Sequence, residues 1–253
     1  MVAAALPVER RALVTALGRE IDALADPDRV AGILRVVPGA RTNGAPVPRL
    51  RALAGRVPRA KDAEAFERLC AAMDDLARTR SREHLLVGAF IVGRHQRLVK
   101  TLPWTRVARW LGAVDNWETC DQLAAEVLAT MVDANPDLVD RLLRLARDPD
   151  PWQRRLAVAT AASVNQRGRA QPAVTRAICE ALERDPSPMI RKAVAWARRE
   201  LAKHDERREL ARHDARRGLT KREARQGRQS APGGEPSARS ARGRAAAGRT
   251  RRS

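Results

Sequence analysis

Apolar residues recur along this chain at three- and four-residue steps, the spacing that places side chains on one face of an α-helix. Within residues 8–24 the recurring positions are Leu13, Val14, Leu17, Ile21 and Leu24. The same pattern predicts helices over residues 27–37, 49–57, 62–77, 81–99, 103–111 and 116–134. Residues 38–48 carry three prolines and two glycines, which predicts a loop. The expected fold class is therefore all-α.

A block of eight residues occurs twice, 37 residues apart, over 148–155 and 185–192. Each copy is expected to end one helix, turn at its prolines and begin the next helix at Pro151 or Pro188, where a missing N–H is harmless. A period near 37 with paired helices is typical of a HEAT-like helical-repeat solenoid, whose units share one concave surface. Arg155 and Lys192 occupy equivalent positions. They would form a basic row on that surface, suited to a duplex backbone.

The C-terminal region changes character. Thr220 and Glu223 have the spacing of a capping box and predict one last helix. After Gln226 the chain consists mostly of Gly, Ser, Ala, Pro and Arg, which cannot bury a core. We therefore expect a HEAT-like repeat domain over residues 1–226 and a disordered Arg-rich tail over residues 227–253.

Composition supports helix and adds a strong charge. Of the 253 residues 44% are hydrophobic, with two Phe and no Tyr, and Ala, Leu and Val predominate, which favours helix over sheet. The formal net charge is +19. Residues 211–253 hold thirteen Lys or Arg against three acids, so this stretch carries 13 − 3 = +10 and the preceding residues +9. Such a balance predicts attraction to nucleic acid or to an anionic membrane surface.

Several classes of protein are disfavoured. The three cysteines, Cys70, Cys120 and Cys179, form no CxxC pair and are expected to be small buried hydrophobes in a reducing compartment. The four histidines show no spacing for a metal or for catalysis, so we expect no metal and no cofactor. The N-terminus does not resemble a signal peptide, and no apolar run is long enough to span a membrane. We expect a soluble, cytoplasmic, nucleoid-associated monomer without a membrane partner.

The candidate chemistry lies in residues 115–121, Asp-Asn-Trp-Glu-Thr-Cys-Asp. Asn116 or Asp115 is placed to cap the helix that follows. Trp117 and Asp121 are four residues apart and so share one helix face. An indole beside a carboxylate suits recognition of a cation. In a basic chain, this pair suggests a positively charged lesion in DNA; the plainer interpretation is a core tryptophan and a solvated aspartate.

Five blocks, in order over roughly residues 35–225, resemble the DNA alkylation-repair glycosylases of the AlkD type, which are HEAT-like repeat proteins. Gly44-Ala45-Pro46-Val47-Pro48-Arg49-Leu50-Arg51 resembles their loop-to-helix signature, and Trp117 to Asp121 their Trp-x-x-x-Asp helix. Trp152 to Arg155 resembles their Trp-x-x-Arg helix start, and Lys192 to Trp196 their Lys-Ala-x-x-Trp helix. Leu219 to Ala224 is similar to their closing helix.

The resemblance implies excision of N3- or N7-alkylated purines from duplex DNA, without a deep pocket for the base. It places Trp117, Trp196 and Asp121 as catalytic residues around the deoxyribose of the lesion, and Arg155 facing the DNA. One departure is Asn116, which stands where the family often has a second tryptophan. The motif contains no lysine for a Schiff base, so we expect a monofunctional enzyme without strand-nicking activity.

The remaining positions are weighed from the residues themselves. Candidate contacts to the DNA backbone are Arg154, Lys192, Arg191, Arg198 and Arg51. Trp152 is interpreted as packing at the repeat junction, and Trp104 and Trp110 as structural. Two alternatives stay open: a non-catalytic helical-repeat scaffold that binds nucleic acid, and a scaffold whose tail targets RNA or the nucleoid.

Overall fold

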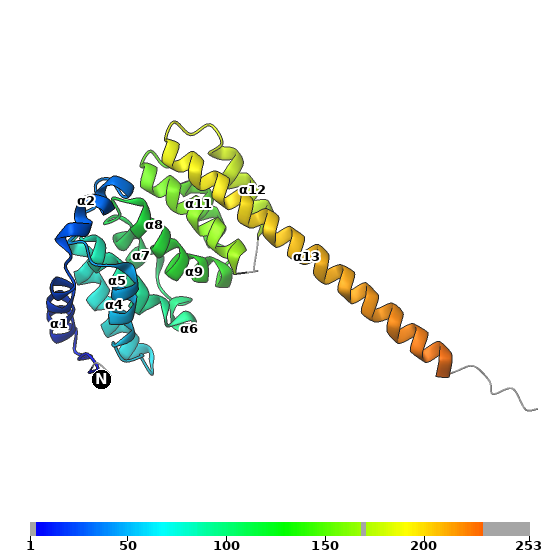
Figure 1. Ribbon diagram of the computed structural model, residues 1–253, viewed down its shortest axis with the longest axis horizontal. Coiled ribbons are helices and arrows are strands. Elements are labelled where there is room, and N and C mark those ends of the chain that lie inside the picture. The colour runs from blue at the N-terminus through cyan, green and yellow to red at the C-terminus, as the bar shows by residue number, and fades with distance from the viewer. Residues whose placement is uncertain (1–3, 168–170, 230–253) are drawn as a thin grey trace, which may run out of the picture. The chain divides into compact units, whose positions relative to one another are not determined.

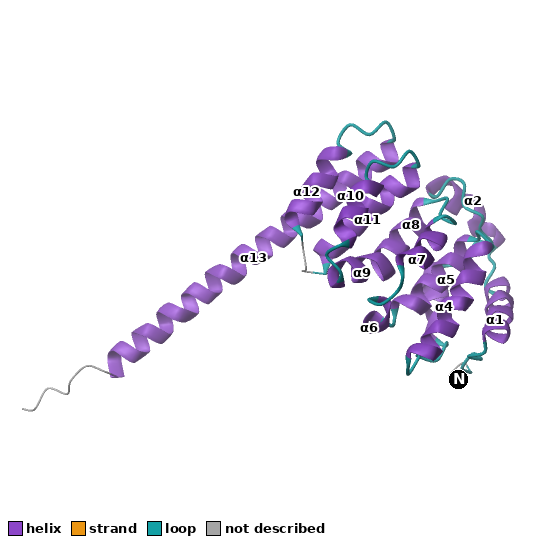
Figure 2. Cartoon of the chain, turned by 180° about the vertical axis from the view of Figure 1, so that it is seen from behind, coloured by secondary structure: helices purple, strands orange, loops and turns teal. Residues whose placement is uncertain are grey.

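The computed structural model describes residues 4–167 and 171–229, and this part of the chain is a helical-repeat, all-α fold without strands (Figures 1 and 2). The chain divides into two compact units, residues 1–207 and 208–253. The elements in order are α1 (Arg10–Ala23), α2 (Pro27–Val36), α3 (Val47–Gly55), α4 (Ala63–Arg78), α5 (Arg82–Gly93), α6 (Gln96–Val99), α7 (Trp104–Leu111), α8 (Trp117–Leu123), the π-helix η1 (Ala124–Leu128), α9 (Ala129–Ala134), α10 (Leu138–Leu145), α11 (Pro151–Gln166), α12 (Pro172–Ala181) and α13 (Pro188–Gln229).

The first unit is built from two layers of helices. In one layer α3 packs against α5, α5 against α8, and α8 against α11. In the other, α1 packs against α4, α4 against α7, and α10 against α12. Apolar side chains from both layers meet between them, among them the fully buried Leu85 and Leu123 of the first layer and Val107 of the second. The layering carries the amino-terminal ends of α8 and α11 into one region, where the candidate site forms.

The 37-residue repeat is confirmed by matching hydrogen bonds in its two copies. Arg154 Nη1 donates to the carbonyl oxygens of residues 148 and 149, both at 2.8 Å. Arg191, its equivalent, donates through Nη1 to the carbonyl oxygens of residues 185 and 186, at 2.6 and 3.0 Å. The helices begin at Pro151 and Pro188, as predicted. In each repeat one arginine therefore closes the turn that precedes its own helix.

The predicted single helix over residues 81–99 is wrong, because it is interrupted at Arg94 and His95 between α5 and α6. Arg94 Nη1 donates to the carbonyl oxygens of Ala54 and Val57, and His95 Nε2 accepts from the backbone N–H of Ala60 at 2.9 Å. These side chains therefore bind the last turn of α3 and the segment that follows it. The break depends on a contact 35 residues away, which a local pattern cannot reveal.

The predicted helix over residues 116–134 is present, but η1 interrupts its α geometry after Leu123. Glu126 in η1 lies against Gly93 of α5, where an added Cβ would come within 2.7 Å of the glutamate side chain. Arg51 of α3 holds the same carboxylate through a 2.9 Å ion pair. Single π turns inside α-helices are frequent at functional sites. Here the π turn follows directly after the segment that carries Trp117 and Asp121.

The C-terminal prediction needs a correction. No helix begins at Thr220, because α13 runs without interruption from Pro188 to Gln229. A capping box can begin a helix only where the residues before it are non-helical. The residues before Thr220 are already part of α13. Residues 227–229 are part of this helix, and the rest of the expected tail, 230–253, lies outside the described residues.

Over the described residues, no helix combines the length and apolar character needed to cross a bilayer. All three cysteines are free and buried, as expected. Burial raises the pKa of the Cys70 thiol to about 12, and it also raises the pKa of Cys120 and Cys179. These thiols are therefore protonated, inert parts of the core.

Candidate functional site

The first turn of α8 presents the predicted indole and carboxylate on one face. Asn116 caps this helix, and its Oδ1 accepts the backbone N–H of Thr119 at 3.0 Å. Thr119 and Cys120 point into the core and are buried. Trp117 and Asp121 are only partly buried, which leaves both on the opposite face of the helix. The cap thus fixes the start of the helix, and the buried positions fix its rotation.

Arg155 joins these two side chains. Its Nε and Nη2 donate to the two carboxylate oxygens of Asp121 at 2.9 and 2.7 Å, a two-pronged pair between α11 and α8. Its Nη1 donates to the carbonyl oxygen of Met189 at 3.1 Å, and its guanidinium carbon lies 5.7 Å from the centre of the Trp117 ring. The side chains of Arg155 and Asp121 are 9% and 18% exposed, so the pair lies at the edge of solvent.

The electrostatic state of Asp121 follows from this position. Burial raises the pKa of the Asp121 carboxyl above its ordinary value, and Arg155 opposes that rise by hydrogen bonding and by its charge. A carboxyl group with a perturbed pKa beside a specific charged partner is a frequent mark of a functional site. The group is desolvated enough to interact strongly with a nearby cation, while Arg155 favours its ionised form.

A partly open cavity of about 620 Å³ lies beside the pair. Segments far apart in the sequence form its wall, namely the end of α2 and the first turns of α8, α11 and α13. The lining residues are Arg35, Val36, Pro38, Trp117, Trp152, Arg155, Met189 and Lys192. Three of them are cationic and two are tryptophans. Such a wall attracts an anionic chain and offers flat apolar surface for a sugar or a base.

Trp152 and Trp196 do not both lie where the sequence suggested. Trp152, interpreted as a packing residue, contacts the core and also lines the cavity. Trp196 packs partly buried against the core and does not line the cavity. It is four residues beyond Lys192 on α13, hence on the same helix face about one turn further along. The sequence contains no signal that separates these two indoles.

Helix α2 closes the other side of Trp117. The indole Nε1 donates to the carbonyl oxygen of Val36 at 2.8 Å, which ties the end of α2 to the start of α8. A second cavity of about 480 Å³, lined largely by residues of α2 and α3, shares Trp117 and Val36 with the first. No residue of α2 is buried. Trp117 therefore lines both cavities and lies between them.

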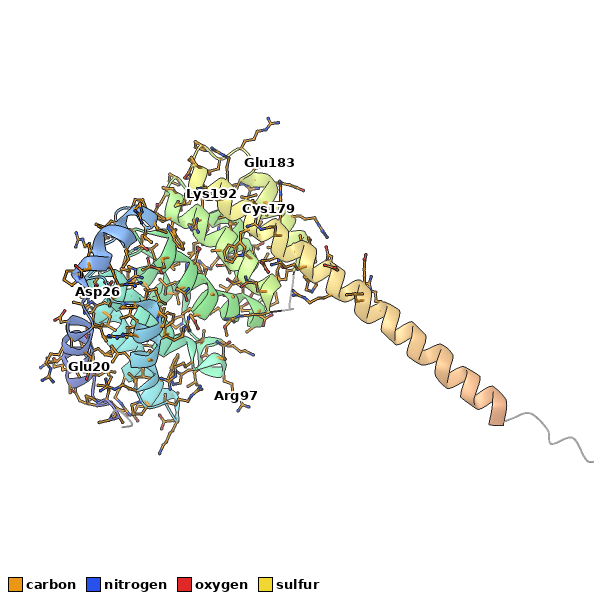
Figure 3. All side chains as sticks on the ribbon, viewed as in Figure 1. Glu20, Asp26, Arg97, Cys179, Glu183 and Lys192 are labelled. Carbon is orange, nitrogen blue, oxygen red and sulfur yellow. The ribbon has the colours of Figure 1, made fainter. Side chains whose placement is uncertain are left out.

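The other predicted backbone contacts differ in how their charge is used. Lys192 lines the cavity and is exposed (Figure 3). Arg154 is paired with Asp185 at 2.7 Å, in addition to its loop carbonyls. Arg198 forms an ion pair with Glu183 at 2.9 Å, and Arg51 lies 3.8 Å from the ring centre of Phe90 while it holds Glu126. DNA contacts by these arginines stay predictions.

Sequence reasoning missed Arg35, Val36 and Met189. Arg35 and Val36 belong to α2, about eighty residues before Trp117, and only the folded chain brings the two segments together. Met189 occupies the repeat position equivalent to Trp152, which was the one available signal. Among the described residues, no group of three or more His, Cys, Asp or Glu side chains could hold a metal ion.

The family comparison agrees with this arrangement. A model of the DNA alkylation repair enzyme family matches residues 17–226. The chain belongs to this family. No curated protein and no solved structure gives a significant match. As a family member the protein has a role in DNA repair, and DNA is the substrate class that the family implies. The matched region includes α8, α11 and the cavity between them.

Proposed function

We propose that the protein is a monofunctional DNA glycosylase that hydrolyses the N-glycosidic bond of cationic alkylated purines in duplex DNA. The proposed substrates are 7-alkylguanine and 3-alkyladenine, and the protein would act as a monomer without a cofactor. The observation that carries the proposal is that Trp117 and Arg155 line a cation-rich cavity and that Arg155 holds the Asp121 carboxylate directly behind this wall. No deep pocket for an extruded base is part of the proposal.

Hydrolysis of this glycosidic bond requires few catalytic groups from the protein. An alkylated purine already carries a positive charge, so the bond between C1′ and the base nitrogen breaks with its electron pair going to the base, which becomes neutral. The sugar passes through an oxocarbenium-like state, and water then adds at C1′ and releases a proton to solvent. A single carboxylate that stabilises the sugar cation and positions the water suffices. Asp121 supplies that carboxylate.

The size of this contribution can be bounded. A full negative charge about 4 Å from the developing cation stabilises it by roughly 4 kcal/mol at an effective dielectric constant near 20. That corresponds to about a thousandfold in rate. The value is an upper bound while Arg155 stays paired with Asp121, because the guanidinium cancels part of the charge. A backbone phosphate that draws Arg155 away would restore it and would orient the strand at the same time.

The aromatic groups add a smaller amount. An indole face against the sugar favours its cationic state by about 1–2 kcal/mol when the contact is desolvated. Trp117 is placed for this role next to Asp121, and Trp152 borders the same cavity. Trp196 is proposed as a third aromatic contributor on α13, one turn from the cavity wall. Lys192 and Arg155 would hold the backbone phosphates on either side of the lesion.

The test is excision from a duplex that contains 7-methylguanine, followed by alkaline cleavage of the abasic sites. Strand breaks above the protein-free control are expected with the native chain. Asp121→Asn should lower the single-turnover rate by about a hundredfold to a thousandfold while duplex binding is largely kept. Breaks no more frequent than in the protein-free control would eliminate the glycosylase proposal, and binding without breaks would favour a non-catalytic scaffold.

A further inference from the structure

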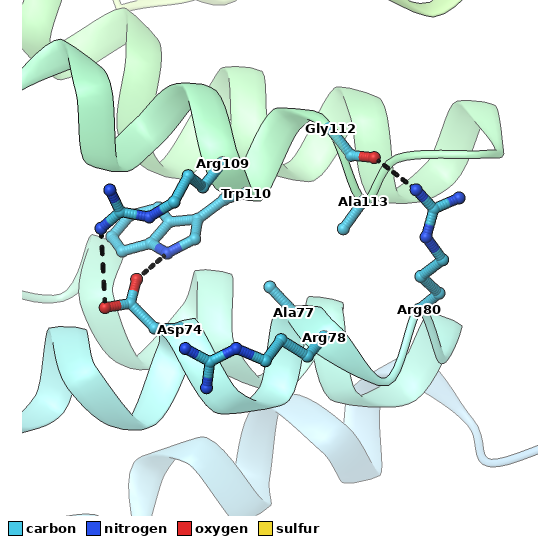
Figure 4. A pocket seen from close by; sticks show the side chains of 8 residues that line it. All are labelled: Asp74, Ala77, Arg78, Arg80, Arg109, Trp110, Gly112 and Ala113. Carbon is cyan, nitrogen blue, oxygen red and sulfur yellow. Dashed lines mark hydrogen bonds and ion pairs between the residues drawn. The ribbon is translucent and has the colours of Figure 1, made fainter.

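A separate cavity of about 320 Å³ lies where α4 and α7 end (Figure 4). Its lining residues are Asp74, Ala77, Arg78, Arg80, Arg109, Trp110, Gly112 and Ala113. Three guanidinium groups face one carboxylate there, so the lining carries 3 − 1 = +2 charges. Figure 4 shows Arg109 and Arg78 towards one end, Arg80 at the other, and the small side chains of Ala77 and Ala113 between them. None of these residues belongs to the candidate site.

The one carboxylate of this cavity is already occupied. Asp74 accepts a 2.7 Å hydrogen bond from Nε1 of the fully buried Trp110, and Arg106 and Arg109 approach its other oxygen at 3.3 and 3.9 Å. Three donors therefore share the charge of Asp74 at the inner wall. The side chain of Arg109 is 63% exposed, which leaves its guanidinium open to a ligand from solvent.

The charges of Arg78 and Arg80 are also only partly neutralised by their neighbours. Arg78 is 71% exposed, and its partner Asp75 is shared with Arg10, which holds the same carboxylate at 2.7 Å. Arg80 Nη2 donates to a backbone carbonyl, that of Gly112, at 2.9 Å. A carbonyl does not neutralise a guanidinium. The cavity thus gathers three cations whose charges are only partly compensated by their neighbours.

The backbone of Arg80 is held in an unfavourable conformation. Its φ of +53° lies in the left-handed region, and no other non-glycine residue in the described part of the chain has a positive φ. A side chain with a Cβ costs free energy in this region, and glycine would not. Strained residues of this kind cluster at ligand-binding sites. Here the strained turn carries the Arg80 guanidinium from the end of α4 to the end of α7.

The cavity is close to the candidate site along the chain. Ala113 precedes Trp117 by four residues, so their Cα atoms are at most about 14 Å apart. Each strand of a duplex presents a phosphate about every 3.4 Å along the helix axis. This phosphate spacing is shorter than the separation, so a duplex that extends from Trp117 past the ends of α4 and α7 would place backbone phosphates at this cavity.

We propose that Arg78, Arg80 and Arg109 form a binding site for a phosphate group, supplied by the backbone of the duplex that the protein repairs. Planar guanidinium groups match phosphate oxygens in geometry and charge. The inference takes the identity of the nucleic acid from the proposed function but does not depend on glycosylase chemistry. Free inorganic phosphate is the other source of the same group, and the experiment separates the two.

The test variant is Arg80→Gly combined with Arg109→Gln. The glycine relieves the positive φ, and Asp74 keeps Trp110 and Arg106 after Arg109 is replaced, so the fold is expected to hold. The control combines Arg19→Gln with Arg97→Gln, two exposed positions on α1 and α6 that do not line this cavity. It removes the same net charge. Figure 3 shows Arg97 well apart from Lys192.

Affinity for a lesion-free duplex is measured over a range of salt concentrations, so that excision plays no part. Loss of one phosphate contact should lower the slope of log affinity against log salt by about 0.9, and the affinity itself by about tenfold at low salt. The control variant should change the slope by clearly less. Equal slopes for the two variants would mean that only overall charge affects DNA binding, which would overturn the assignment of a backbone phosphate to this site.

A second arm uses inorganic phosphate alone. The thermal midpoint of the native chain and of the Arg80→Gly, Arg109→Gln variant is compared in phosphate and in chloride at equal ionic strength. If phosphate stabilises only the native chain while the DNA salt slopes agree, the site binds free phosphate and the DNA source is wrong. If neither the slope nor the midpoint separates the variant from the native chain, the site does not exist.

Discussion

The candidate site and the cavity between α4 and α7 contain the same residue types, arranged for different ends. In the cavity, Trp110 is fully buried, and its Nε1 points at Asp74, 2.7 Å away. The edge of the ring is thus joined to the carboxylate, and the ring is part of the hydrophobic core. Arg106 and Arg109 complete the contacts of Asp74. The hydrogen bond between this indole and this carboxylate therefore stabilises the fold.

At the candidate site the indole is turned the other way. Trp117 gives its Nε1 to a backbone carbonyl of α2, so its ring is fixed without help from the acid. Asp121 is held by Arg155 instead, and that guanidinium also lies near the face of the ring. Trp117 and Arg155 line the cavity, and Asp121 is held behind Arg155 and does not line it itself.

The difference teaches that residue types do not identify a site by themselves. Both places contain a tryptophan, an aspartate and an arginine. In each place the three residues lie within about forty positions of one another in the sequence. The two places differ in the partner that the indole N–H binds and in how much of the tryptophan remains exposed to solvent. The following substitutions test that distinction.

The largest effect is expected when Trp110 and Trp117 are replaced, one at a time, by phenylalanine. Trp110→Phe leaves a void in the core and removes a donor from Asp74, which should cost about 2–3 kcal/mol of unfolding free energy. Trp117→Phe should cost about 1 kcal/mol, because the ring is only partly buried and the main loss is its hydrogen bond to the carbonyl oxygen of Val36. Excision should show the reverse order, with about a tenfold loss for Trp117→Phe alone.

These two variants are compared by denaturant unfolding and by single-turnover excision of 7-methylguanine. A stability loss at Trp117 as large as that at Trp110 would mean that both indoles are structural. The distinction drawn between the two regions would then collapse. An excision rate that is unaffected by Trp117→Phe would remove the aromatic contribution and leave Asp121 as the single proposed catalytic group.

The same contrast shows how much the sequence predicts. Trp117 and Asp121 could be paired from the sequence because they share a helix, and the repeat could be read because Pro151 and Pro188 mark its turns. The ion pair between Arg155 and Asp121 was not predictable, since α8 and α11 are separated in the sequence by η1, α9 and α10 and meet only after folding. The resemblance placed Arg155 at the DNA, and the geometry adds its acidic partner.

Two of the failures of prediction come from contacts outside the local window, and one comes from a helix that continues through a local signal. The helix over residues 81–99 breaks because Arg94 and His95 bind the segment after α3. The capping box at Thr220 is overruled by the helix that runs through it. Trp152 and Trp196 cannot be ranked from spacing, because the position of α2 decides which indole borders the cavity.

A second prediction concerns the charge state of Asp121. Burial raises its pKa, and Arg155 counteracts the rise. Arg155→Gln removes the counteracting group, so the pKa should rise further. Asp121 would then lose its negative charge at a higher pH on acidification, and the acid limb of the excision rate should move to higher pH. The direction would be opposite for a carboxyl group whose pKa the arginine raised.

The measurement is the pH profile of single-turnover excision at saturating protein. Arg154→Gln is the matched control, since Arg154 is the neighbouring arginine and is engaged with Asp185 and the turn before α11. Its acid limb should coincide with that of the native chain. An unchanged limb for Arg155→Gln, or an equal displacement for both variants, would show that Arg155 does not tune the Asp121 carboxyl.

The smallest effect is expected at neighbouring cations of α13. Lys192 lines the cavity, whereas Arg191 holds two carbonyl oxygens of the turn before its own helix. Lys192→Gln should lower duplex affinity about fivefold to tenfold and reduce the salt slope by about 0.9. Arg191→Gln should cost about 1 kcal/mol of stability and leave the slope nearly unchanged. Because the two substitutions remove the same charge at adjacent positions, a general electrostatic effect would give equal slopes. Unequal slopes would show that the site depends on where a cation lies, as the contrast between the two regions requires.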